Sequence, residues 1–229
     1  MKRRSLQIFG SCVFLLLTGY FVWAPSSVYS QPNSNQGIQP LLELGGQDIH
    51  SLIPKNVHSL LLPQEIVQYL EKLEDTPPDW TKLRHHDIAE QSERLFQINR
   101  ARDEARLAKD SLRQQPVAFV WGGLLRQYLP KFNGFSLALG PELIQTSWGI
   151  IRFKPIDLPD YLVAIPSVDL RKQLMARQKD GELIDIIVLC IGTLIADESL
   201  IYGFSHDGDQ RGMILPVVSV QKIMYLFKR

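Results

Sequence analysis

An α+β fold is predicted for this chain of 229 residues. Apolar residues recur at helical spacing within 63–115, which predicts helices there. From residue 116 onward, short segments rich in β-branched and aromatic residues alternate with turn signals, which predicts strands. A single helical pattern, over 168–179, interrupts them. Hydrophobic residues make up 45% and charged residues 21% of the chain, which excludes a wholly disordered, collagen-like or polytopic membrane protein.

The N-terminus has the layout of a secretory signal peptide. Basic residues at 2–4 precede an uncharged apolar run over 8–23, and Val28 and Ser30 suit a cleavage site before Gln31. The apolar run is shorter than the roughly 20 residues that span a bilayer, but longer than the usual core of a signal peptide. Residues 1–30 are therefore a signal peptide or an uncleaved membrane anchor. Both interpretations place the rest of the chain outside the cytoplasm.

The charge balance and the cysteine content bear on phosphate binding and on disulfide bonds. The formal net charge is +1, and three of the 25 basic residues lie in the leader, so 22 basic residues face 24 acidic ones in the remainder. Such a balance does not favour a phosphate-binding surface. Of the two cysteines, Cys12 lies in the leader. The body therefore has no internal disulfide, and Cys190, within an apolar run, is expected to be a buried thiol of raised pKa.

Four parts are predicted along the chain. Residues 1–30 are the leader, 31–62 a linker and irregular segment, 63–115 a helical region and 116–229 a β-rich domain. The linker assignment rests on the many Gln, Asn, Pro and Gly residues that follow Gln31.

Two helices are expected in the helical region. The first covers 63–75, where Pro63 suits a first turn and the Thr76-Pro77-Pro78 cluster ends the helix. The second runs from Thr81 or Leu83 to about Arg113 and carries many charges. We interpret it as a helix that lies on the domain with most of its surface in water. A coiled-coil partner helix is the alternative, but Arg102 and Lys109 would occupy its seam.

The β-rich domain is read as a series of short strands. A helical turn is expected over 124–129 after Gly122-Gly123, a bend or bulge at Gly192 and a bend or edge position at Pro216. Ser167 is the expected N-cap of the inserted helix. The expected strands are 117–121, 135–139, the latter half of 143–154, 161–165, 183–196, 200–204, 213–220 and 223–227.

Short connections predict mostly antiparallel pairing. A candidate topology is a partly open five-stranded barrel with one helix between its strands. Its order of elements over residues 144–228 is similar in outline to the oligonucleotide/oligosaccharide-binding (OB) barrel.

Motifs with a well-defined chemistry are not found in the sequence, which has no phosphate-binding loop, nucleophile elbow, HExxH motif or paired-cysteine zinc motif. His85-His86-Asp87 does not form a metal pincer, because adjacent helical side chains point about 100° apart, so it is interpreted as a polar helix start. Asp207, Asp209 and Gly212 match three positions of a calcium loop. Arg211 and Val218 occupy positions where that loop requires oxygen ligands, and a surface hairpin is expected instead.

Three further groups contain residue types that known sites use. Ser199, His206 and an aspartate are the ingredients of a hydrolase, but nothing in the sequence fixes their geometry. Lys131-Phe132 and Arg152-Phe153-Lys154 combine basic and aromatic residues, as nucleic-acid sites do. Arg152-Phe153-Lys154 also has the alternation of a half-buried strand, and an exported location makes nucleic acid an unlikely partner. Accordingly, no catalytic, cofactor-binding or metal-binding residue is put forward.

The leading functional hypothesis is a bacterial envelope protein, periplasmic or tethered to the inner membrane by residues 8–23. It would act without catalysis, through contact with an envelope protein partner. The alternatives are an OB-like ligand-binding domain and an uncharacterised envelope enzyme. An OB-like binder would need exposed aromatic side chains, for which Trp148, Phe153 and Tyr161 are the candidates.

Overall fold

The computed structural model describes residues 37–106, 112–195, 199–205 and 211–228. The predicted leader and the first residues of the predicted linker lie outside these ranges. The described chain mixes helices and strands, with strands in the majority, which confirms the α+β class. In the described ranges no helix has both the length and the apolar composition that a membrane crossing requires. The helices are α1 (Pro63–Glu74), α2 (Trp80–Leu83), α3 (Ile88–Arg106) and α4 (Val168–Lys179).

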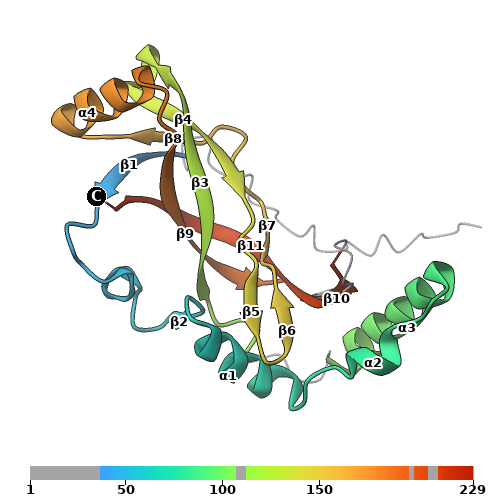
Figure 1. The fold of residues 1–229 in the computed structure, drawn as a ribbon. Coiled ribbons are helices and arrows are strands. Elements are labelled where there is room, and N and C mark those ends of the chain that lie inside the picture. The colour runs from blue at the N-terminus through green and yellow to red at the C-terminus, as the bar shows by residue number, and fades with distance from the viewer. Residues whose placement is uncertain (1–36, 107–111, 196–198, 206–210, 229) are drawn as a thin grey trace, which may run out of the picture. The chain divides into compact units, whose positions relative to one another are not determined.

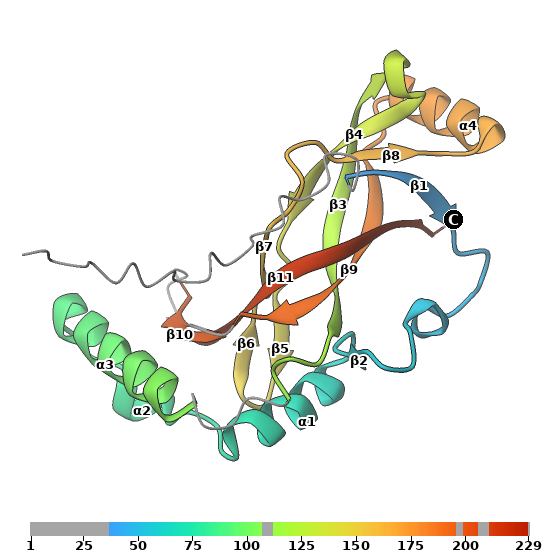
Figure 2. The same cartoon turned by 180° about the vertical axis from the view of Figure 1, so that it is seen from behind.

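Among the described residues, six strands form a closed barrel in the order β1-β8-β4-β3-β9-β11, and β11 pairs again with β1 (Figures 1 and 2). β1 is parallel to both of its neighbours, whereas the long ladders that join β4, β3, β9 and β11 are antiparallel. Closure removes the open edges that a flat sheet would expose. The strands are β1 (Ile38–Glu43), β3 (Val117–Leu129), β4 (Gly134–Gly140), β8 (Val163–Ile165), β9 (Ile184–Leu194) and β11 (Gly212–Phe227).

The barrel differs from the five-stranded one expected over 144–228. It takes in β3 and β4 from before that range, and also β1, which lies in the segment 31–62 that composition assigns to a linker. β1 escapes sequence analysis because Leu41 is its one buried residue, so the strand lacks the alternation of buried and exposed positions.

β11 extends beyond the barrel into a small second sheet, where it lies between β10 and the β5–β6 hairpin. β7 pairs with β11 further along, and β2 pairs with the start of β3. These strands are β2 (His58–Ser59), β5 (Ile144–Thr146), β6 (Gly149–Ile151), β7 (Lys154–Ile156) and β10 (Leu200–Phe204).

The interior of the barrel is packed with buried apolar side chains from its strands and from the segments that flank it. Phe119 and Phe153 stack inside it with ring centroids 4.5 Å apart. α4 closes one end and α1 lies at the other (Figure 1), and both helices contribute buried leucines to the same core, such as Leu174 and Leu70. Ser167 caps α4 as expected, since its Oγ accepts from the amide of Leu170. The bounds of α4 match those predicted.

A second apolar cluster lies on the outside of the barrel. Leu44 and the segment 49–61, which includes a 3-10 turn at Ile49–Leu52, cover the outer face of β3, β9 and β11. The buried residues of that face are Ala118, Leu189, Ile191 and Leu226. The barrel wall is therefore sandwiched between two apolar layers along part of its height.

A bulge lets β11 keep its apolar residues inside the barrel. Val220 and Ile223 both belong to the core, although an odd spacing along a regular strand would place them on opposite faces. The pairing with β9 shifts register between Val220 and Lys222, and this extra residue restores the inward direction. The sequence predicts a bulge at Gly192 of β9, whereas the bulge lies on β11, directly after Val220, which pairs with Gly192. A Cβ on Gly192 would stand 2.1 Å from the carbonyl oxygen of Ser219, so glycine is needed for this close approach.

Three local expectations are wrong. Residues 124–129 belong to β3, because the ladder to β4 holds that segment extended, and the ladder to β9 also holds Leu124 and Leu125. The long helix expected from residue 81 is split into α2 and α3, since Asp87 accepts from the amide of Ala89 and starts a new helix. The strands expected at 213–220 and 223–227 are one strand, joined through the bulge.

Trp80 fixes the helical region to the small sheet. Its Nε1 donates to the carbonyl of Trp148 at 2.7 Å, and its ring lies 5.6 Å from that of Tyr202 and 5.7 Å from that of Phe204. A Cβ on Gly212 would stand 2.0 Å from the indole, so the ring lies directly on the backbone of β11.

Asn99 of α3 covers the outer edge of β10. The amide of Val217 in β11 donates to the carbonyl of Ser199, just before β10. Hydrogen-bonded positions alternate along an antiparallel ladder, so residues 201 and 203 also bond to β11. The amide and carbonyl of Tyr202 therefore point away from β11. The side-chain amide of Asn99 donates to the carbonyl of Tyr202 at 3.0 Å and accepts from its amide at 2.8 Å. α3 therefore lies against the small sheet, which agrees with the prediction that this charged helix packs on the domain.

Replacing Trp80 should loosen the helical region. We expect Trp80→Ala to lower the free energy of unfolding by about 2–4 kcal/mol, because a large half-buried ring and its hydrogen bond are lost. Trp80→Phe keeps most of the packing and should cost less than half as much. Urea unfolding followed by circular dichroism measures both. Equal stability of Trp80→Ala and the parent would contradict this role.

Candidate functional site

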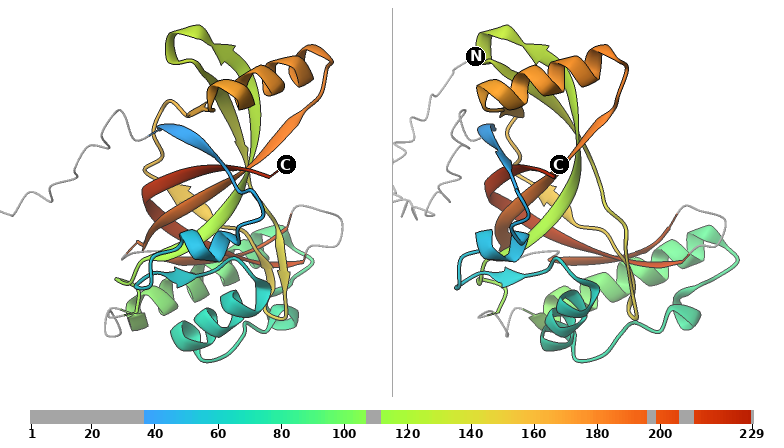
Figure 3. Two further views of the ribbon diagram at one scale, coloured as in Figure 1. Left: turned by 90° about the vertical axis from the view of Figure 1, so that its left-hand side faces the viewer. Right: turned by 60° about the vertical axis from the view of Figure 1, so that its left-hand side comes forward.

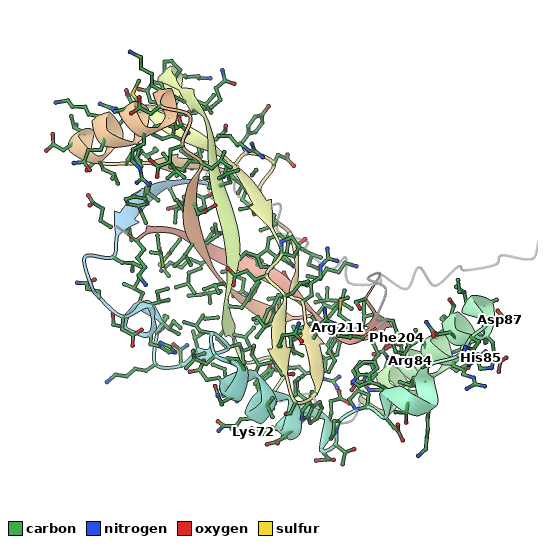
Figure 4. The ribbon with its side chains drawn as sticks, in the orientation of Figure 1. Lys72, Arg84, His85, Asp87, Phe204 and Arg211 are labelled. Atoms are coloured by element: carbon green, nitrogen blue, oxygen red, sulfur yellow. The ribbon has the colours of Figure 1, made fainter. Side chains whose placement is uncertain are left out.

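The histidine pair of the sequence lies at the start of α3. Figure 4 labels His85 and Asp87 at this place. The amide of Asp87 donates to His85 Nδ1 at 3.2 Å, and the His85 Nε2 lies 3.3 Å from a carboxylate oxygen of Glu90. These contacts lie at the N-terminus of α3, which agrees with the interpretation of His85-His86-Asp87 as a polar helix start. Within the described residues, no group of three or more His, Cys, Asp or Glu side chains could hold a metal ion.

The calcium-loop and hydrolase candidates fall partly outside the described residues, which omit 206–210. Of the described members, Val218 is fully buried in the barrel and cannot reach an ion in a surface loop. Ser199 is 1% exposed, so its hydroxyl is closed off from a substrate in solvent. Arg211 continues the β10–β11 hairpin, where its amide donates to Ser205 Oγ.

The aromatic candidates for ligand stacking divide in two. Trp148 and Phe153 are buried, while Tyr161 is 72% exposed. Arg152 and Lys154 flank Phe153 and are exposed, so this segment shows the expected alternation of a half-buried strand. Two of the three rings thus serve the core.

Cys190 is fully buried on the inner face of β9. Burial raises the pKa of its thiol to about 12, so the thiolate is scarce at neutral pH. Cys190 is a core residue, as expected.

Three hollows of the described chain lie outside the packed interior of the barrel. The largest hollow that we describe, here named the wall cleft, has a volume of about 710 Å³ and lies on the outer face of β4, β3 and β9. Next to it the outer layer of residues 49–61 covers the same face over Val120 and Ile187. β3 and β9 are paired along this wall, and Figure 3 shows the ribbon from two further sides.

Two glycines opposite each other form the floor of the wall cleft. Gly122 of β3 pairs with Gly140 of β4, and both point outward because Trp121 and Leu139 beside them pack toward the core. A Cβ on Gly140 would meet nothing within 4 Å, and one on Gly122 would make ordinary contacts only. Neither has the positive φ that favours glycine. By contrast, a Cβ on Gly123 would clash with Ile186 and Val188 inside the barrel.

Glycine within a strand weakens it, by about 0.5–1 kcal/mol relative to alanine in typical cases. The fold itself does not require this cost at Gly122 or Gly140. At these two positions no side chain stands over the wall, so another molecule can approach the backbone there.

Charges of both signs surround this floor. The exposed side chains are Arg126, Glu142, Asp185 and Lys228. Among the described residues none of these side chains has an ion-pair or hydrogen-bond partner. They are therefore available to a docked molecule that carries complementary charges.

A second hollow of about 620 Å³, the helix–hairpin cleft, lies between α1 and the β5–β6 hairpin. Its lining residues are mostly uncharged and polar. They are Pro63, Gln64, Val67, Gln68 and Glu71 from α1, with Gln145, Thr146 and Ser147 from the hairpin.

A third hollow of about 380 Å³ lies between the end of α1, α2, α3 and β10. Its central charges neutralise each other, since Arg102 bonds to Glu74 at 2.6 Å and its guanidinium lies 3.4 Å from the centre of the Tyr202 ring. We assign this cluster a structural role in holding α3 against α1 and β10.

A charged cluster that the sequence analysis did not single out ties the outer layer to α1. His50 lies with Nδ1 at 2.9 Å from Asp48 and Nε2 at 3.1 Å from Glu65. Glu65 also accepts from the amides of Leu61 and Leu62 and from the hydroxyl of Ser59. The signal available in sequence was a glutamate at the third position of a helix, which often caps it.

Only a protonated imidazole can donate from both nitrogens, so this geometry favours His50 in its charged form. The hydrogen bond to Asp48 is the main cause that raises the pKa of His50 above its ordinary 6.5. Burial opposes the ionised form of Glu65, but its hydrogen bonds from Ser59, Leu62 and Leu61 lower its pKa below 4.5.

Comparisons with protein-family models, with curated proteins and with solved structures find no match to this chain.

The His50 cluster should make stability depend on pH. The pKa of His50 is raised in the folded state, so its contribution to folding stability is complete below pH 6.5 and is lost as the pH rises through the folded pKa. The pKa of Glu65 is lowered, so its contribution is present above pH 4.5 and is lost as the pH falls through the folded pKa. We expect His50→Gln to cost up to about 1 kcal/mol at pH 5.5, since the groups are partly exposed, and less at pH 9. Urea unfolding at both pH values measures this, with the exposed His86→Gln as control. A pH-independent difference would contradict the assignment.

Proposed function

We propose that this protein is an exported or membrane-tethered bacterial envelope component that acts without catalysis. In this proposal another envelope protein docks in the wall cleft. The observation that carries it is the Gly122–Gly140 pair, which leaves the floor open although the fold does not require glycine there.

The leader supports the proposed location. Basic residues at 2–4 followed by the apolar run 8–23 are typical of export signals and N-terminal anchors. The single cysteine of the remainder, Cys190, is buried and needs no disulfide partner, which is compatible with an oxidising compartment.

The charged side chains around the wall cleft indicate the chemistry of the partner. Arg126 and Lys228 would pair with carboxylates of the partner, and Glu142 and Asp185 with its basic side chains. A segment that carries both signs of charge and lays its backbone on the glycine floor fits best. Contacts of this kind set specificity and association rate more than affinity.

The volume of the wall cleft supports one alternative. About 710 Å³ lies within the range of small-molecule sites, roughly 300–1,000 Å³. An OB-like ligand-binding domain or an envelope enzyme would use the same cleft for a small polar molecule. A protein partner would be recovered by crosslinking, whereas a small ligand would co-purify and be released on denaturation.

Filling the cleft should abolish docking. The Cβ of Gly140→Leu would meet no neighbour within 4 Å, and the φ of Gly140 is not positive, so we expect the variant to fold. Crosslinking in envelope fractions should give a discrete adduct for the parent and at least about a tenfold weaker one for Gly140→Leu, the loss expected when steric exclusion removes the contact area. Ala176→Leu, exposed on α4, is the matched control.

An adduct of equal yield in Gly140→Leu would place the partner elsewhere. Recovery of free monomer alone under several conditions would overturn the docking proposal as a whole.

The location is tested separately. The intact mass of the native protein should correspond to a chain starting at Gln31 if the leader is removed, or should include residues 1–30 if it is an anchor. A reporter fused to the C-terminus should be active outside the cytoplasm. Reporter activity confined to the cytosol would contradict the proposed location and envelope role.

A further inference from the structure

The middle of the wall cleft is apolar. Gly122 of β3 pairs with Gly140 on one side and with Ile187 on the other, and two residues further along Leu124 pairs with Ala138. All five residues line the cleft and are partly exposed. An occupant that buries this floor must therefore present small or apolar side chains to it.

This floor continues a surface that the chain itself covers nearby. Leu52 and Ile53 of the outer layer belong to the same apolar cluster as Val120 and Ile187. Ile187 also lines the wall cleft. The floor of the cleft is thus the uncovered continuation of an apolar face, which favours a protein segment as its occupant.

The backbone of the central strand is already engaged. β3 pairs with β4 on one side of Gly122 and with β9 on the other. A segment lying on this strand must satisfy its own amides and carbonyls, which an α-helix does and an isolated extended strand does not. Three strands about 4.8 Å apart form a floor about 10 Å wide, close to the diameter of a helix at about 10–12 Å.

Charged side chains stand at opposite ends of the floor. One carboxylate oxygen of Glu142 lies 3.9 Å from the position that a Cβ on Gly122 would take. Arg126 follows four residues later on β3, which is about 13 Å at 3.3 Å per residue. Both side chains line the cleft and are exposed. The cleft therefore has a negative end and a positive end.

Two further charges at the Arg126 end offset each other. Leu226 pairs with Ile187, so Lys228 and Asp185, two residues beyond them, are neighbours across the β9–β11 ladder. Both line the cleft. The Arg126 end thus keeps one net positive charge, against one negative charge at the other end.

We infer that the wall cleft receives an amphipathic α-helix of the envelope partner, an inference that rests on the docking proposed above. The helix lies along β3 with its N-terminus toward Glu142 and its C-terminus toward Arg126. This direction suits the partial positive charge of a helix N-terminus and the partial negative charge of its C-terminus. Insertion of an amphipathic helix into an apolar groove is a recurring mode of recognition.

The side chains of the partner helix follow from the same geometry. One lysine or arginine in its first turn faces Glu142. One aspartate or glutamate about eight residues later, which is about 12 Å along a helix, faces Arg126 and Lys228. Small or apolar side chains between them lie on the glycine pair and on Leu124.

Photocrosslinking of the full chain in its native cells tests the conformation and the direction. Pro141 or Asp185, exposed at opposite ends of the cleft, is replaced by the photoreactive amino acid p-benzoylphenylalanine. Mass spectrometry of the two adducts identifies the partner residues that are joined. We expect the two sites to lie about seven or eight residues apart on one partner, with the Pro141 site nearer its N-terminus. An extended segment would give about three or four residues.

Charge reversal tests the orientation independently. Glu142→Lys and Arg126→Glu should each lower the adduct yield about two- to fivefold, the range of exposed charge pairs. The differences should disappear at about 1 M salt, where such charges are screened. Asp160→Lys and Lys131→Glu, exposed outside the cleft, are the matched controls and should leave the yield unchanged.

The outcomes separate this inference from the docking itself. A spacing of three or four residues, the reverse order of the two sites, indifference to both charge reversals or an adduct between two copies of this chain would each overturn the partner helix. A partner that is still lost in Gly140→Leu would then leave the docking proposal standing. If neither photoreactive variant captures a polypeptide, the docking proposal and this inference are both wrong.

Discussion

The structure depends on the pairing of β1 with both β8 and β11, which closes the barrel. Without β1, both neighbouring strands would expose backbone donors and acceptors along an edge. The carbonyl of Gly37, just before β1, accepts from the hydroxyl of Tyr225 at 2.7 Å and from the amide of Val163 at 2.9 Å. Tyr225 is fully buried, and burial is the main cause that raises its pKa, so the phenol stays a neutral donor.

β11 connects the closed barrel to the rest of the molecule. One part of it forms the barrel with β9 and β1, and the other forms the small sheet with β10 and β6. The bulge between Val220 and Lys222 keeps the inner face apolar along its whole length. Trp80 lies on Gly212 at the first residue of the strand, so the helices are tied to the same element that closes the barrel.

Local patterns were sufficient for some elements and insufficient for others. α1, α4 with its Ser167 cap, and β10 follow from spacing and capping signals that lie within the element itself. β1 could not be found this way, since its partners lie more than a hundred residues away and Leu41 is its one buried position. The wall cleft was missed for a related reason: Gly122-Gly123 looks like a strand break, and only the ladders on both sides keep it extended.

A filled, closed barrel directs binding to its outer surfaces. In the wall cleft β3 is already paired on both sides, so the open floor offers contact area and charge but no backbone donors from that strand. Docking in the wall cleft therefore depends on shape and charge.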